Sequence, residues 1–178
     1  ATHRALGVWK TMQLHLIPLL RTCADDLKIV FNVLKVVVKL TMKPEQLGAK
    51  IAEPDRKVVA ICGDAGFLMN VQDLETMVRR KLPVVVVVWV DGEYGLIKWK
   101  QQNSFNGRHS ELRFGNPDLE MWAKSYGAWG KTLKSGDELI PALKKAFKQE
   151  GPAVIGIPID YRENMKLSKR LGKVEFPI

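Results

Sequence analysis

Two short apolar runs, at residues 58–62 and 84–90, stand out in the hydrophobic pattern of the chain. Both are rich in β-branched residues and are bounded by turn-forming residues, a pattern that is typical of buried strands. The segment between them, residues 68–80, has the apolar spacing of a helix. The three segments predict a strand-helix-strand unit, whose right-handed crossover places both strands parallel in one sheet.

The next part of the chain predicts a further helix. Asn116 has the character of an N-cap and Pro117 that of a first helical residue, and Gly127 is placed to end the helix. The segment before this helix, residues 101–113, is long and polar. We expect it to form a loop that covers a site.

A last helix and two more strands complete the pattern. Residues 132–133 belong to a short strand, and Ser135 with Glu138 forms a capping box ahead of a helix at 139–148. Residues 153–157 follow as another buried strand. Strands that alternate with helices in this way predict the α/β class, a doubly wound and mostly parallel sheet with helices on both faces.

An aspartate follows each of the first two predicted strands. Asp64 lies between Gly63 and Ala65-Gly66, and Asp91 stands 27 positions farther along the chain. Parallel strands bring both carboxylates to the same edge of the sheet, where open α/β sheets bind ligands. A single aspartate here often only caps a helix or forms a turn. Two carboxylates, with glycines that allow close backbone approach, suit Mg²⁺ carrying a diphosphate.

These residues resemble the thiamine-diphosphate-dependent enzymes, specifically the diphosphate-binding, C-terminal domain of acetolactate-synthase-like proteins. That family has a Gly-Asp-Gly-like start and an Asn or Asp at the spacing found here. The resemblance implies that Asp64 and Asp91 bind Mg²⁺ through their side chains and Glu93 through its backbone carbonyl. It extends over residues 47–167, with close similarity at 58–66, 70–81, 94–101, 114–118, 123–127 and 158–161.

The resemblance also implies a set of contacts with the cofactor. Leu96 and Ile97 would line an apolar wall beside the thiazolium ring and the substrate methyl group; the buried face of a helix is the alternative for this pair. Met42 would support the pyrimidine ring, although the glycines that flank this position in the family are missing here. The implied cofactor-binding residues are Gly63, Asp64, Ala65, Gly66, Tyr94, Gly95, Leu96, Ile97 and Met42.

The formal net charge of +9 raises the question of a nucleic-acid partner. Lysines and arginines are spread over the chain, and no nucleic-acid-binding signature accompanies them, so we expect none. Lys98, Lys100, Arg108 and His109 either contact an acidic substrate or form a solvated charged face. The charge therefore does not change the interpretation of the acidic motif.

Length and cysteine content indicate one domain in a reducing compartment. The 178 residues divide into a divergent segment that is hard to assign, 1–45, and a thiamine-diphosphate-binding domain, 46–178. No apolar run approaches the roughly 18 residues of a membrane helix, so no membrane span is predicted. Cys23 and Cys62 do not form a disulfide framework, which favours the cytoplasm.

The resemblance implies decarboxylation of pyruvate and its carboligation to a second 2-keto acid. Family enzymes need a glutamate from a separate pyrimidine-binding domain, which is not found in this chain, so no catalytic residue is assigned here. We expect the isolated chain to be inactive, the missing domain to come from the same or another polypeptide, and the enzyme to be a homo-oligomer. Two alternatives stay open: a non-catalytic diphosphate-binding or assembly module, and a related 2-keto acid decarboxylase or carboligase.

Overall fold

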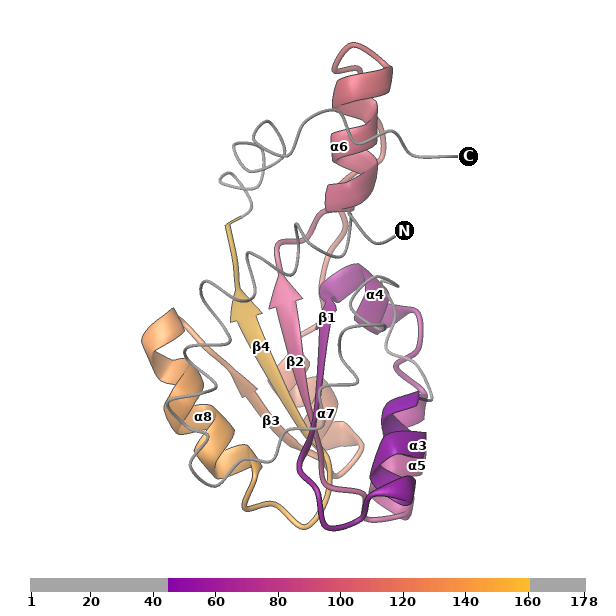
Figure 1. The fold of residues 1–178 in the computed structure, drawn as a ribbon. Helices are drawn as coiled ribbons and strands as arrows, with labels where there is room; N and C mark the ends of the chain where they lie inside the picture. Colours follow the sequence, from indigo (N-terminus) through magenta and orange to yellow (C-terminus); the bar gives the residue numbers. More distant parts are fainter. Residues whose placement is uncertain (1–44, 161–178) are drawn as a thin grey trace.

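The computed structural model describes residues 45–160 and contains one four-stranded sheet. All neighbouring strands pair in parallel, in the order β1-β2-β4-β3 (Figure 1). Met42 and Cys23 lie outside the described residues, and the division of the chain at residue 45 stays a prediction. The strands are β1 (Val58–Gly63), β2 (Val84–Val90), β3 (Trp129–Thr132) and β4 (Ala153–Pro158).

Helices cover both faces of the sheet. Alternate residues of β2 point to opposite faces, because side chains in a strand alternate. Val84, Val86 and Val88 belong to a core with α3, α4, α5 and α7, whereas Val85 and Val87 pack with α8. The doubly wound α/β class is thereby confirmed. The helices are α3 (Glu45–Ala52), α4 (Asp64–Leu68), α5 (Asp73–Arg79), α6 (Gly95–Ser104), α7 (Leu119–Ser125), η2 (Gly136–Glu138) and α8 (Leu139–Ala146).

The crossover between β1 and β2 differs from the single helix predicted at 68–80. Two short helices form instead, and the first begins at Asp64 itself, directly after the strand. Between them the chain makes tight turns, in which the Asn70 amide donates to the Phe67 carbonyl and the Asp73 amide to the Asn70 carbonyl. The core contacts of both helices hold this bent path, because Phe67 and Leu74 are fully buried.

Helix α7 begins two residues later than the sequence predicts. Asp118, and not Asn116, is the N-cap: its carboxylate accepts hydrogen bonds from the amides of Glu120 and Met121 at 2.9 and 3.0 Å. Gly127 follows the helix with a φ of +82°, the left-handed conformation predicted for the residue that ends it. Asn116 is left free for another contact.

The last third of the chain departs from prediction at its boundaries. Ser135 makes no side-chain cap, so the predicted capping box is wrong; a 3-10 turn leads into α8 instead. Strand β3 begins at Trp129 because it pairs with β4 from Trp129 opposite Ala153. Tertiary pairing, which has no local signature, sets these bounds.

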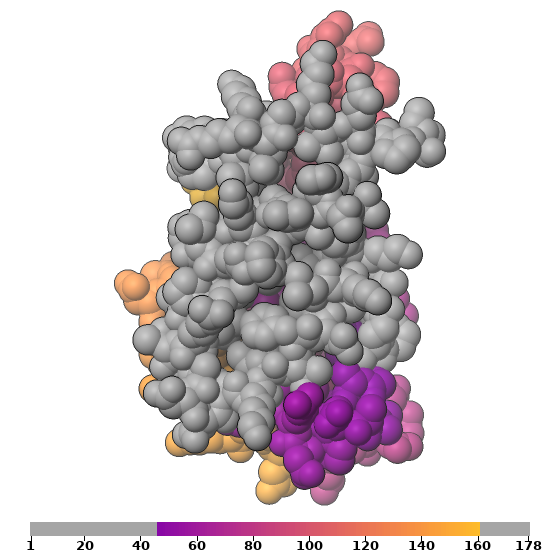
Figure 2. Space-filling view, viewed as in Figure 1, coloured from indigo at the N-terminus to yellow at the C-terminus, as the bar shows by residue number. Residues whose placement is uncertain are grey.

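Helix α6 extends into the segment predicted to be a covering loop, 101–113, and takes up its first four residues, 101–104. It extends away from the carboxyl ends of β1 and β2 and buries none of its residues against the described core (Figure 1). In the space-filling view it forms one end of the described part, with α3 toward the other (Figure 2). After α6 the chain returns toward the sheet, and Arg113 pairs with Glu93 in an antiparallel bridge. We call α6 and this returning segment the α6 arm.

Candidate functional site

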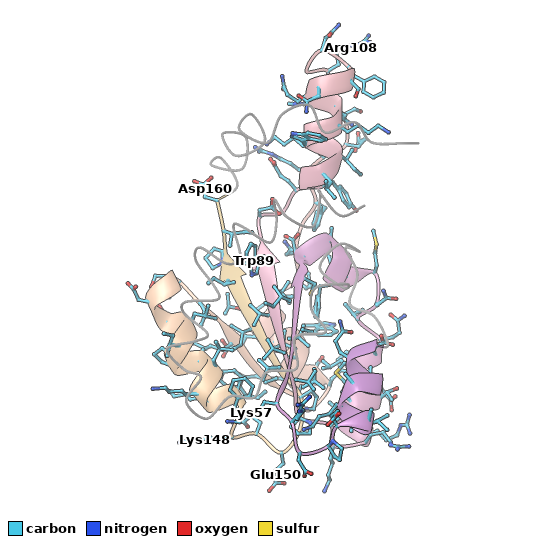
Figure 3. The ribbon with its side chains drawn as sticks, in the orientation of Figure 1. Lys57, Trp89, Arg108, Lys148, Glu150 and Asp160 are labelled. Atoms are coloured by element: carbon cyan, nitrogen blue, oxygen red, sulfur yellow. The ribbon has the colours of Figure 1, made fainter. Side chains whose placement is uncertain are left out.

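The carboxyl edge of the sheet carries the two aspartates singled out by the sequence. Figure 3 shows Trp89 and Asp160 toward this edge, Lys57, Lys148 and Glu150 at the opposite one, and Arg108 at the tip of the α6 arm. Asp64 follows β1 and Asp91 follows β2, and these strands are hydrogen-bonded neighbours. The parallel pairing therefore brings the two carboxylates together, as the sequence predicts.

Asp64 is the most organised side chain of this edge and is only 2% exposed. Its Oδ1 accepts from the amide of Ala65 at 2.8 Å. Its Oδ2 accepts from the amides of Asp91 at 3.1 Å and Gly92 at 2.8 Å, and from Asn116 Nδ2 at 2.6 Å. Hydrogen bonds to a carboxylate are stronger than neutral ones, so four of them fix its orientation.

Asp91 is half-buried and lies beside Asp64. Burial raises the pKa of its carboxyl group, and the negative charges of Asp64 and Glu93 raise it further, whereas the Glu93 amide, which donates to Asp91 Oδ1 at 3.4 Å, opposes this. Gly95 leaves the space next to it open, since a Cβ there would stand 3.8 Å from Asp91 Oδ2. A cation between the two aspartates would relieve the repulsion.

The side chain of Glu93 pairs with basic residues. Its carboxylate pairs with Lys98 and with Arg113 Nε, the latter at 3.0 Å, and these hydrogen bonds lower the pKa of the Glu93 carboxyl. Its carbonyl accepts one hydrogen bond, from the Gly95 amide at 2.9 Å. A carbonyl oxygen has two lone pairs, so this one retains the capacity for a further contact.

The predicted cofactor-binding positions frame this edge. A Cβ added at Gly63 would meet no described atom within 4 Å, so there is room beside the end of β1. Ala65 and Gly66 form the first turn of α4. Tyr94 packs against Phe114 with ring centroids 4.8 Å apart. Each of these positions stays a prediction as a cofactor contact.

Leu96 and Ile97 lie in the first turn of α6, and each is 49% exposed. The alternative that they form the buried face of a helix does not hold among residues 45–160, because α6 buries none of its residues there. Two exposed aliphatic side chains at a ligand-binding edge are suited to an apolar ligand group.

The basic residues considered from the sequence have varied partners. Lys98 pairs with Glu93, and Arg108 Nε bonds the Phe105 carbonyl at 3.4 Å. Lys98 and His109 line a shallow hollow with Glu93 and residues 110–113. Arg113, which the sequence reading did not consider, shares Glu93 with Lys98 and therefore helps to fix this hollow.

Cys62 lies in β1 two residues before Asp64. Burial raises the pKa of its thiol to about 12, and the charge of Asp64 contributes to this shift. A thiol held in the protonated form is a poor nucleophile and metal ligand. Cys62 is therefore a packing residue beneath the site.

Among residues 45–160, no group of three or more His, Cys, Asp or Glu side chains is arranged so that it could hold a metal ion. The set implied by the sequence consists of two carboxylates and a backbone carbonyl, so this result does not bear on it. In the same range no helix has the length and apolar character needed to cross a membrane.

A parallel α/β sheet with two carboxylates at its carboxyl edge defines a ligand-binding domain of the doubly wound class. Residues 43–157 match the model of the thiamine pyrophosphate enzyme C-terminal TPP binding domain, and the chain belongs to this family.

Curated relatives place the chain close to the acetolactate synthases. It is 40% identical over 133 residues to acetolactate synthase of Bacillus subtilis, covering 75% of this chain and 23% of the relative. It is 38% identical over 128 residues to catabolic acetolactate synthase of Raoultella terrigena, covering 72% and 23%. The chain thus spans about a quarter of the length of these relatives.

Solved structures of decarboxylases share the fold. A thiamine diphosphate-dependent 4-hydroxybenzoylformate decarboxylase of Rhodococcus jostii superimposes with a TM-score of 0.63 at 26% identity, over 67% of this chain and 23% of that one. Benzoylformate decarboxylase of Polynucleobacter necessarius gives 0.58 at 32% identity, over 64% and 22%.

Proposed function

We propose that this chain binds the diphosphate of thiamine diphosphate through Mg²⁺ in an acetolactate-synthase-like enzyme. The observation that carries the proposal is the rigid placement of Asp64 beside Asp91 at the carboxyl edge of β1 and β2. Membership of the thiamine pyrophosphate enzyme family supports the cofactor. The similarity to acetolactate synthases supports the reaction class.

The residues at this edge suit Mg²⁺. The ion prefers oxygen ligands in octahedral geometry and usually keeps water or phosphate oxygens in several positions. Asp64 Oδ1 accepts only one of the four hydrogen bonds to this carboxylate, so it has capacity for a cation. Asp91 and the carbonyl of Glu93 would complete the ligands from the protein.

The chain's own residues would position the cofactor and shield it. The glycines at 63 and 95 leave the backbone open to the diphosphate, and Leu96 and Ile97 would exclude water from the apolar side of the site. Bound thiamine diphosphate supplies an electron sink for the carbanion that a 2-keto acid leaves on losing CO₂.

The proposal requires a partner domain that binds the pyrimidine ring and supplies the activating glutamate. This domain would come from the rest of the same polypeptide or from another chain, consistent with the quarter of the relatives' length that is covered here. The substrates would be pyruvate and a second 2-keto acid, and the assembly a homo-oligomer in the cytoplasm.

A 2-keto acid decarboxylase is the second candidate. The superposition on a 4-hydroxybenzoylformate decarboxylase and a benzoylformate decarboxylase favours it, because their fold is shared over about two thirds of this chain. Their identities of 26% and 32% are below the 40% to an acetolactate synthase, so carboligation is the preferred assignment. A non-catalytic assembly module would show metal-dependent binding but no turnover in any complex.

Titration calorimetry tests the metal bridge. Thiamine diphosphate is titrated into the full chain with Mg²⁺ and again after EDTA. We expect binding only with Mg²⁺, because without it the diphosphate would face two carboxylates of like charge. Equal affinity in the two titrations would refute the proposal.

A further inference from the structure

Asn116 makes a contact with the site that neither the motif nor the comparisons assign. It stands 52 positions after Asp64, and its Nδ2 donates to Asp64 Oδ2 at 2.6 Å. An ionised carboxylate only accepts hydrogen bonds, so the amide must face it with the NH₂ group. Of the four donors to Asp64, this is the only one from a side chain among the contacts described.

The segment that carries Asn116 is fixed to the loop after β2. The Tyr94 amide donates to the Leu112 carbonyl at 2.8 Å, and the Phe114 amide to the Gly92 carbonyl at 3.1 Å. The rings of Tyr94 and Phe114, tilted at 43° to each other, add a side-chain contact. Residues 112–116 are therefore a third segment that forms this edge of the sheet, together with residues 63–66 and 91–95.

The choice of asparagine at position 116 is not explained by stability alone. Its Oδ1 is buried and has no hydrogen-bond partner in the described part of the chain. A buried acceptor without a partner is costly to a fold. Helix α7 does not need Asn116 either, because Asp118 caps it. What Asn116 does provide is a donor to Asp64.

We propose that Asn116 is a positioning residue for the metal-binding carboxylate. Its amide holds Asp64 Oδ2 next to residues 112–116, and Oδ1 is thereby left facing the ligand side in one fixed orientation. This inference rests on the proposed role of Asp64 in binding Mg²⁺. Without this donor, three backbone amides still hold the carboxylate but less firmly, and the ion must complete its ordering on binding.

The test compares two variants of Asn116 with a matched control. Asn116→Leu keeps the size of the side chain and removes the donor, and Asn116→Ala removes it without risk of overpacking. Asp118→Ala, two residues away, removes the cap of α7 but touches no ligand of the metal. All three are expected to lower the melting temperature, so melting alone does not separate a structural role from a positioning role.

Mg²⁺ affinity is the first readout, measured by titrating Mg²⁺ into the full chain at a fixed excess of thiamine diphosphate. Both Asn116 variants should bind Mg²⁺ about tenfold more weakly, as expected for one lost hydrogen bond to a charged group. Asp118→Ala should stay within about twofold of wild type. An unchanged Mg²⁺ affinity in both Asn116 variants would overturn the inference.

Hydrogen exchange of the Gly92 amide is the second readout and needs neither metal nor cofactor. This amide donates to the same Oδ2 as Asn116, so its exchange should become faster in both Asn116 variants and stay unchanged in Asp118→Ala. Unchanged exchange in the Asn116 variants, or faster exchange with intact Mg²⁺ affinity, also overturns the inference. Failure of the wild-type chain to bind thiamine diphosphate with Mg²⁺ instead refutes the proposed function itself, and the inference with it.

Discussion

Replacing Asp64 by alanine should destabilise the chain even when no metal or cofactor is present. The carboxylate accepts hydrogen bonds from three backbone amides and from Asn116 Nδ2. Asp64→Ala leaves all four donors without this partner. The first consequence of the substitution is therefore a loss of folding free energy, separate from any loss of ligand binding.

The magnitude follows from the burial of these donors. A buried donor left without a partner costs ~1 to 3 kcal/mol. The donor residues are only half-buried, so water can reach part of this edge, and we take about 1 kcal/mol for each. Removing the repulsion between Asp64 and Asp91 returns about 1 kcal/mol, the upper end of what charge pairs screened by water contribute in measurements. The net expected loss is about 3 kcal/mol.

Urea unfolding followed by circular dichroism measures this loss, with EDTA present throughout. Asp91→Asn is the matched control, because it relieves the same repulsion, keeps the size of the side chain and retains an oxygen that can accept from the Glu93 amide. We expect the control to be about 1 kcal/mol more stable than wild type, because it removes the repulsion and no hydrogen bond. A loss below 1 kcal/mol in Asp64→Ala would refute the view that this carboxylate organises the edge.

The same pair of variants separates the two predicted ligands. Asp64→Ala should abolish Mg²⁺-dependent binding of thiamine diphosphate, whereas Asp91→Asn should retain it, because an amide oxygen is an accepted ligand for a hard cation. Calorimetry with Mg²⁺ shows the difference. If Asp91→Asn binds as poorly as Asp64→Ala, Asp91 is wrongly assigned.

Two further predictions concern reactivity. The thiol of Cys62 has its pKa raised to about 12, so iodoacetamide at pH 8 should alkylate it at least a hundredfold more slowly than a free cysteine. Mass mapping of the Cys62 peptide measures the rate of alkylation. Rapid modification would contradict the burial of this thiol. The isolated chain should form no measurable acetolactate from pyruvate with Mg²⁺ and thiamine diphosphate, because the glutamate that activates the cofactor is expected from another domain and such proton transfer is worth ~10² to 10⁴-fold. A colorimetric acetoin assay checks this, and turnover by the chain alone would require the two-domain proposal to be abandoned.

The strands around the site were predictable because their signal is local. Residues 58–62 and 84–90 are β-branched runs, and buried parallel strands are apolar along their whole length. Their parallel pairing then fixes the common edge of Asp64 and Asp91. The bounds of β3 could not be predicted in this way, since Trp129 belongs to a strand only through its pairing with Ala153.

The start of α7 shows where local signals conflict. Asn116 and Asp118 are both good N-cap residues, and Pro117 favours an extended conformation for the residue before it. The sequence alone offered no reason to prefer Asp118. The structure resolves the choice through Asp64, which takes the amide of Asn116 and leaves the cap to Asp118.

Asn116 is the part of the candidate site that sequence motifs do not reveal. Asp64 and Asp91 follow strands and are found from strand patterns, but Asn116 reaches Asp64 from a segment that pairs with residues 92–94. No periodicity links positions 64 and 116, because the link depends on the antiparallel pairing of two irregular segments. A residue that suits a local role which its neighbour fills instead is therefore a useful place to look for a tertiary contact with a functional group.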